Sequence, residues 1–156
     1  MKQRPYKHLA HVAAFDATPL VFFTAVSFKR RAILASDAVH DILRTIWLQA
    51  GERNGWWVGD YIIMPDHLHF FARPCRTAER MREWIKMWKS LSARRIAGCL
   101  GIEPPVWQEE YFDRYLRSSE NYTDKWRYVE ANALKSHLVA RAEDWPYRGR
   151  INALMF

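Results

Sequence analysis

The chain has 156 residues, 49% of them hydrophobic and 15% aromatic, which is enough to bury one substantial core. Its formal net charge of +7 indicates an anionic partner, with nucleic acid ahead of an anionic membrane surface. Two cysteines exclude a disulfide framework, and the chain has neither the apolar core of a signal peptide nor a run that could span a bilayer. We therefore expect one domain, residues 1–156, in the reducing cytoplasm, with no membrane partner.

The first predicted elements are a strand, a helix and a pair of strands. Residues 19–34 are rich in β-branched and aromatic side chains, which predicts a strand. Residues 36–55 predict a helix, because apolar residues recur at helical spacing and a glycine closes the segment. Residues 56–74 predict two short strands. Pro65 and Asp66 form the turn between them, because proline cannot supply a ladder hydrogen bond.

A second helix and a further strand follow. Residues 77–101 predict a helix whose apolar stripe includes Trp84 and Trp88 and which ends at Gly101. Residues 104–117 then predict a short strand with a turn.

The last predicted elements are a third helix and a tail. The helix covers residues 118–139, and the tail, residues 140–156, is expected to pack through Trp145. Helices that all return to one antiparallel sheet give an α+β fold. The ferredoxin-like split βαβ arrangement is the simplest topology with this order of elements.

Two histidines give the first chemical signal. In "MPDHLHFF", His67 and His69 lie two residues apart, so in a strand both side chains project from the same face. Two imidazoles at this spacing can direct ring nitrogens at one divalent ion. Each could instead be a surface histidine or a hydrogen-bonded core histidine, and the spacing alone leaves both interpretations open.

The third predicted helix presents a tyrosine away from its packing stripe. At 100° per residue, Tyr128 and Asn132 lie roughly 110° from the middle of the apolar stripe that contains Trp126. Tyr128 and Asn132 are one turn apart, and Lys125 and Lys135 flank them. Without the histidines, a half-buried structural tyrosine would be the plainer interpretation.

A phenolate can attack a phosphodiester and form a covalent intermediate. Because the phosphodiester is anionic, the attack needs a cation, and the two histidines with the Asn132 carbonyl oxygen would hold Mg²⁺ or Mn²⁺. Tyr111, Tyr115 and Tyr122 are rival nucleophiles. Tyr122 falls on the packing stripe, and the other two are typical of core and rim residues.

These segments resemble a known family. The stretch "MPDHLHFFARP" resembles the histidine–hydrophobe–histidine (HUH) motif of the IS200/IS605-type Y1 single-strand DNA transposases. The stretch "VWQEEYFDRYLRSSENYTDKWRYVEANALKSHLV", followed by "DWPY", is similar to the REP-associated tyrosine transposase branch of that family. The resemblance covers most of the chain, from "LVFFTAVSF" to "DWPY".

The resemblance implies a ferredoxin-like fold, a divalent metal and a tyrosine that attacks single-stranded DNA. The products would be a 5′-phosphotyrosine link and a free 3′-hydroxyl. His67 and His69 match the motif histidines, Tyr128 matches the nucleophile, and Asn132 matches a third metal ligand. The implied substrates are REP repeats, short palindromes that fold as hairpins, so the protein would act at the bacterial nucleoid. Both monomeric and homodimeric action remain open.

The chain departs from the branch pattern at two positions. Ala133 and His137 stand where the branch commonly has proline and glycine. Without the proline the helix can continue past Asn132, and without the glycine an easy C-terminal cap is lost. The angle at which Tyr128 meets the metal is therefore left open.

Basic residues mark the expected DNA-binding surface, because cationic side chains contact phosphates. They lie at the end of the first strand, along the second helix and on the third helix. We predict DNA contacts from Lys29, Arg30, Arg31, Arg82, Lys86, Lys89, Arg94, Arg95, Lys125 and Lys135. Residues 1–18 are predicted to form an N-terminal DNA-contacting arm.

Two other functions fit parts of the same pattern. A non-catalytic DNA- or RNA-binding domain would keep the fold, bind hairpins and tolerate Tyr128→Phe. A metal enzyme acting on a small substrate would use the histidines differently, but the positive charge and the lysines near Tyr128 count against it.

Overall fold

The computed structural model describes residues 19–116, 119–135 and 139–154, with the backbone alone described at 119–120 and 132–135. The predicted N-terminal arm, residues 1–18, lies outside this part of the chain. The elements are β1 (Leu20–Val26), a 3₁₀ turn η1 (Phe28–Arg30), α2 (Asp37–Asn54), β2 (Trp56–Ile63), β3 (His67–Pro74), α3 (Met81–Leu100), β4 (Phe112–Leu116), α4 (Ser119–Lys135), a second 3₁₀ turn η2 (Ala142–Asp144) and β5 (Arg148–Arg150).

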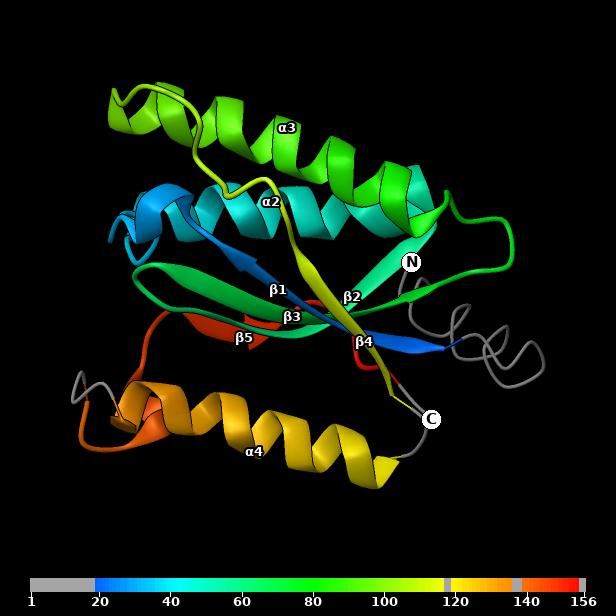
Figure 1. Ribbon diagram of the computed structural model, residues 1–156. Helices are drawn as coiled ribbons and strands as arrows, with labels where there is room; N and C mark the ends of the chain where they lie inside the picture. The colour runs from blue at the N-terminus through cyan, green and yellow to red at the C-terminus, as the bar shows by residue number, and fades with distance from the viewer. Residues whose placement is uncertain (1–18, 117–118, 136–138, 155–156) are drawn as a thin grey trace.

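The strands form one sheet in the order β4-β1-β3-β2-β5, and each neighbouring pair is antiparallel (Figure 1). The run from β1 to β4 has the strand–helix–strand–strand–helix–strand order of the split βαβ unit. The predicted α+β, ferredoxin-like fold is therefore confirmed. The tail adds β5 beside β2, an edge strand that its sequence pattern did not predict.

The sheet separates two helical layers. Helices α2 and α3 cover one face, and α4 covers the other (Figure 1). Side chains alternate along β3 accordingly: Leu68 and Phe70 belong to the core under α2 and α3, whereas Phe71 belongs to the core under α4. Trp84 and Trp88 are fully buried in the first core, so they are packing residues as the helical stripe predicted.

The tail packs through Trp145, as predicted. Its side chain is 8% exposed in the core under α4, and its indole N–H donates to the Ile63 carbonyl oxygen at 2.9 Å. Among the described helices, none combines the length and the hydropathy needed to cross a membrane.

The first strand is shorter than predicted. It ends at Val26, because Lys29 and Arg30 adopt left-handed backbone conformations, with φ of 56° and 53°, and turn the chain toward α2. The boundaries of α2 agree with the sequence signals. Ser36 accepts a hydrogen bond from the Val39 amide at the start, and Gly55 closes the helix with φ of 79°.

Candidate active site

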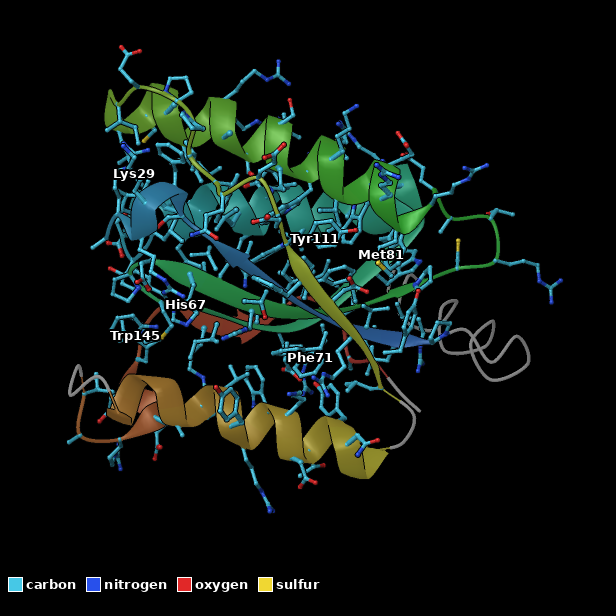
Figure 2. All side chains as sticks on the ribbon, viewed as in Figure 1. Lys29, His67, Phe71, Met81, Tyr111 and Trp145 are labelled. Atoms are coloured by element: carbon cyan, nitrogen blue, oxygen red, sulfur yellow. The ribbon has the colours of Figure 1, made fainter. Side chains whose placement is uncertain are left out.

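The two motif histidines project from the face of the sheet that α4 covers. His67 and His69 share the alternation of Phe71 on β3, and Phe71 packs in the core under α4. In Figure 2, Phe71 lies between the sheet and α4, and His67 lies toward the end of the sheet where β3 begins. The centroids of the two imidazole rings are 5.1 Å apart.

Each histidine has its Nδ1 atom engaged by a neighbouring oxygen. His69 Nδ1 lies 2.9 Å from Thr24 Oγ1, and His67 Nδ1 lies 2.8 Å from Asp66 Oδ1. An Nδ1–H that donates to such an oxygen fixes the tautomer in which Nε2 carries the lone pair. The Asp66 carboxylate can only accept, so a neutral His67 carries its lone pair on Nε2, and His69 has the same tautomer when its Nδ1–H donates to the Thr24 hydroxyl.

Asp66 is itself held in place. Arg30 donates to Asp66 Oδ2 at 3.1 Å, and the Ser27 amide and hydroxyl both donate to the Asp66 backbone oxygen. Burial alone would raise the pKa of the Asp66 carboxyl, but hydrogen bonds from His67 and Arg30 outweigh it and lower the pKa. Arg30, predicted to contact DNA, thus also orients the carboxylate behind His67.

His69 stays neutral at ordinary pH. Burial, followed by the positive charges of His67 and Lys125, lowers its pKa from 6.5 to about 3. The Phe22 ring stacks on the His69 ring, with centroids 5.2 Å apart and planes 17° apart. A neutral, rigidly packed imidazole offers its lone pair to a cation without first losing a proton.

The described part of the chain holds no group of three or more histidine, cysteine, aspartate or glutamate side chains that could enclose a metal. A cation held by the two histidines would take its remaining ligands from other oxygens, such as amide, phosphate and water. Asn132, the predicted third ligand, belongs to α4, but its side chain lies outside the described residues.

Helix α4 presents Tyr128 outward while its neighbours pack. Val129 is fully buried, and the Tyr122 and Trp126 rings lie 4.4 Å and 5.9 Å from the Phe71 ring. Tyr128 is 55% exposed. The helical periodicity placed Tyr128 off the packing stripe, and the structure confirms that placement.

Lys125 connects the tyrosine to the histidines. Its Nζ atom lies 5.6 Å from the centre of the Tyr128 ring and 5.4 Å from the centre of the Phe22 ring. Phe22 stacks on His69, and the charge of Lys125 lowers the pKa of His69. The structure therefore brings a phenol, an ammonium group and the buried imidazole into one region between the sheet and α4.

Two of the three rival tyrosines occupy other places. Tyr122 packs against Phe71. Tyr111 packs against the core under α2 and α3, where burial raises its pKa and makes its phenolate less accessible. Tyr115 is directly opposite Val21, a residue of that same core, but it is 53% exposed and lines one pocket together with Lys125 and Tyr128 of α4, so its position does not separate it from the candidate site.

The other predicted DNA contacts are dispersed. Arg82, Lys86, Arg94 and Arg95 are exposed on α3, in the layer opposite α4. Lys29 is exposed beside Phe28, and the side chain of Lys135 lies outside the described residues.

Two of the predicted contacts are engaged within the protein. Lys89 donates to the backbone oxygens of three consecutive residues, 108–110, and burial lowers its pKa. Arg31 donates to the Pro105 carbonyl oxygen at 2.6 Å. Both side chains therefore hold the segment that leads into β4.

Sequence reasoning missed two residues that hold the histidines. Asp66 was assigned to the turn alone, although an acid directly before a motif histidine was a usable signal. Thr24 was part of an apolar strand, and its one hydroxyl in "LVFFTAV" was the signal for a buried polar partner.

Known structures share this fold. A REP-associated tyrosine transposase bound to a REP hairpin is similar over 84% of this chain and 76% of its own, with 19% identity and a TM-score of 0.66. A protein from Deinococcus radiodurans assigned as a transposase is similar over 72% of this chain and 89% of its own, with 21% identity and a TM-score of 0.52. No curated protein matches the chain by sequence.

The match to a family model is more decisive than these structural similarities. The model describes IS200-like transposases and matches residues 20–132, from the start of β1 into α4. That span includes the histidine pair and the exposed tyrosine. The chain therefore belongs to the IS200-like transposase family and is a DNA transposase.

Proposed function

We propose that this transposase cleaves and rejoins single-stranded DNA at hairpins of the REP type, with Tyr128 as the nucleophile. The observation that carries the proposal is the placement of Tyr128. It is exposed on the helix that covers the histidine face of the sheet, and Lys125 lies between it and the Phe22–His69 stack. The hairpin bound by the similar REP-associated transposase supports the choice of substrate.

In the proposed reaction the Tyr128 phenolic oxygen attacks a backbone phosphorus. A bond forms between that oxygen and phosphorus while the bond from phosphorus to the 3′-oxygen breaks. The phenol loses its proton, and the departing 3′-oxygen gains one. The strand 3′ of the cut stays on the protein as a 5′-phosphotyrosine, and a 3′-hydroxyl of the same or another strand can reverse the step.

His67 and His69 are suited to hold a divalent cation such as Mg²⁺ or Mn²⁺ through Nε2, with Asn132 as a proposed further ligand. When bound, such a cation would neutralise the charge that develops on the phosphate. Thr24 and Asp66 keep the two imidazoles in the required tautomer, and Lys125 places a positive charge beside the attacking phenol.

The test is a covalent-adduct assay on a hairpin oligonucleotide with single-stranded extensions, incubated with Mn²⁺. We expect an SDS-stable adduct that retains a label placed 3′ of the cut and loses a label placed 5′ of it. Tyr128→Phe removes the hydroxyl without changing the ring, so it should abolish the adduct. Tyr111→Phe is the matched control and should leave the adduct at its wild-type level.

Two results would contradict the proposal. An adduct that survives Tyr128→Phe would place the nucleophile elsewhere. Hairpin binding of ordinary affinity, without an adduct on any hairpin tried, would favour a domain that binds DNA or RNA without cutting it. Chelation of the metal and His67→Ala should each remove the adduct, whereas an adduct that survives both would exclude the proposed metal dependence.

A further inference from the structure

The exposed aromatic side chains are concentrated at one edge of the molecule. Among the described residues, four large apolar or aromatic side chains are more than half exposed: Phe112 (59%), Tyr115 (53%), Tyr128 (55%) and Leu48 (56%). Three of these four belong to β4 and α4. Exposed aromatic rings can stack unpaired bases, which have two apolar faces that single strands leave accessible.

The sheet register places one of these rings beside the histidines. Phe112 is directly opposite Thr24, and Thr24 is directly opposite His69, to which it is hydrogen-bonded. Residues opposite each other in an antiparallel sheet project from the same face. Phe112 therefore lies on the α4 face of the sheet, in the same row as His69.

Two cations lie on the same side of the sheet as this ring. Arg114 follows Phe112 on the same face of β4 and is directly opposite Phe22. Lys125 of α4 lies over the Phe22 ring at 5.4 Å. A nucleotide whose base meets Phe112 would thus find two positive charges for its phosphates within the same corner of the molecule.

A pocket occupies this corner. It has a volume of about 480 Å³ and is lined by Arg114, Tyr115 and Leu116 from β4 and by Asn121, Asp124, Lys125 and Tyr128 from α4. Phe112 lies two residues before Arg114 on β4, beside this lining. That volume lies within the roughly 300–1,000 Å³ typical of small-ligand sites. Its polar groups are of two kinds: cations, which suit a phosphate, and an amide and a carboxylate, which suit the edge of a base.

We propose that the pocket between β4 and α4 binds one unpaired nucleotide next to the cleaved phosphate. Phe112, which lies beside the pocket on the same face of β4 as Arg114, stacks on the base, Arg114 and Lys125 contact the flanking phosphates, and Asp124 hydrogen-bonds the edge of the base. The inference rests on the proposed function in one respect, the role of Tyr128, because Tyr128 lines the pocket and identifies the neighbouring phosphate as the one that is cut.

Asp124 gives the subsite a base preference. An ionised carboxylate accepts hydrogen bonds and cannot donate one. It favours bases that present an exocyclic amino group, namely adenine, cytosine and guanine, and disfavours thymine, whose carbonyl oxygens would face a negative charge.

The test measures binding of a fluorescent hairpin with a single-stranded extension to the full chain by anisotropy. An abasic nucleotide is placed at each position of the extension in turn. For the wild type we expect one position at which removing the base weakens binding roughly ten-fold, the size of one stacked base. Phe112→Ala should weaken binding of the intact strand by a similar factor and no longer respond to that abasic position.

Two variants serve as controls for this effect. Phe112→Tyr retains a ring and should bind and respond as the wild type does. Leu48→Ala removes an equally exposed side chain from α2, in the opposite helical layer, and should leave both measurements unchanged.

Base preference is tested at the same position. The wild type should bind a strand with thymine there about five-fold or more weakly than strands with the other bases, the size of a lost base contact. Asp124→Asn supplies an amide that can also donate, so it should remove this discrimination.

The possible results distinguish a failure of the nucleotide-binding subsite from a failure of the proposed cleavage by Tyr128. Abasic sensitivity in Phe112→Ala equal to that of the wild type would overturn the subsite, even if the adduct forms. Base-dependent binding that needs Phe112, without any adduct, would overturn the proposed cleavage and leave the subsite. A change in oligomeric state on Phe112→Ala with unchanged DNA binding would also overturn the subsite, because a second copy would then cover the β4 edge.

Discussion

The hydroxyl of Thr24 orients His69 in the candidate active site. It lies 2.9 Å from His69 Nδ1, on the strand next to β3, and so fixes which ring nitrogen faces outward. Partners of this kind usually change metal affinity by about 10- to 100-fold when they are removed. The effect acts through the orientation of His69 rather than through a contact with the metal.

Thr24→Val keeps the side-chain shape and removes the hydroxyl. We expect Mn²⁺ affinity to fall roughly ten-fold or more, because the His69 ring loses the partner that holds its tautomer. Isothermal titration of the metal-free protein measures this directly, and Thr24→Ser should retain most of the affinity. Equal affinities for Thr24→Val and the wild type would show that the hydroxyl does not orient the ring.

His40 is a partly buried histidine away from the candidate active site. Its Nε2 lies 2.7 Å from the Tyr61 hydroxyl, and its ring packs against Tyr61 and Tyr147. Burial and then Arg44 lower its pKa from 6.5, although Asp41 and Asp37 act in the opposite direction. Below pH 6.5 the unfolded chain therefore binds more protons at this site than the folded protein does.

The stability contributed by neutral His40 should be fully present above pH 6.5 and should fall as the pH drops below that value. His40→Gln cannot titrate, so its unfolding free energy should lack this loss. Urea unfolding of both proteins from pH 7.5 to about 5.5 measures the difference, which should shift in favour of the variant at low pH. A pH-independent difference would contradict the lowered pKa.

At the scale of elements, two helical glycines have opposite surroundings. Gly51 lies in α2, where an added Cβ would come within 2.3 Å of the Trp57 ring. Gly98 lies in α3, and an added Cβ there would meet nothing within 4 Å. Gly51 therefore lets α2 approach β2 closely, whereas Gly98 has no comparable packing role.

Alanine at the two positions should change stability in opposite directions. Gly51→Ala should lower the free energy of unfolding by about 1–3 kcal/mol, because the buried indole has to move. Gly98→Ala should raise it by about 0.5–1 kcal/mol, because alanine favours a helix interior over glycine. Urea unfolding monitored by circular dichroism distinguishes them, and equal effects would show that the close approach at Gly51 is not rigid.

At the scale of the whole molecule, positive charge occurs on both outer layers. The histidines, Tyr128 and Lys125 lie on the α4 side of the sheet, whereas exposed Arg94 and Arg95 belong to α3 on the other side. A single strand at the active site does not need to reach α3. We predict that a hairpin stem extending around the molecule contacts α3 through Arg94 and Arg95.

Neutralising Arg94 and Arg95 together as glutamines should weaken hairpin binding and make its salt dependence shallower. Each lost phosphate contact should change the logarithmic slope by about one. Binding of a short strand without a stem should stay at the wild-type level. Affinity measured from low to high salt provides the check, and equal losses for both ligands would place α3 at the single-strand site instead.

Much of this architecture follows from local patterns. The helices and the paired strands β2 and β3 could be predicted because periodicity, capping and turn residues depend on neighbours in the chain. The strands predicted over residues 19–34 and 104–117 are shorter in the structure, where they are Leu20–Val26 and Phe112–Leu116. The common face of His67 and His69 follows from a two-residue repeat, and the outward position of Tyr128 follows from helical spacing. Strand β5 could not be predicted, because three residues without alternating apolar side chains pair there only through their contact with β2.

The sequence by itself determined the elements, their order and the residue types available for chemistry. Only the tertiary structure decided which of these side chains are in contact. Thr24 pairs with His69, Arg30 pairs with Asp66, and Lys125 lies between Phe22 and Tyr128. Each of these contacts joins distant parts of the chain, and each depends on strand register and on which face of the sheet a helix covers. No local pattern encodes the strand register or the face that a helix covers, because both depend on the packing of the whole core.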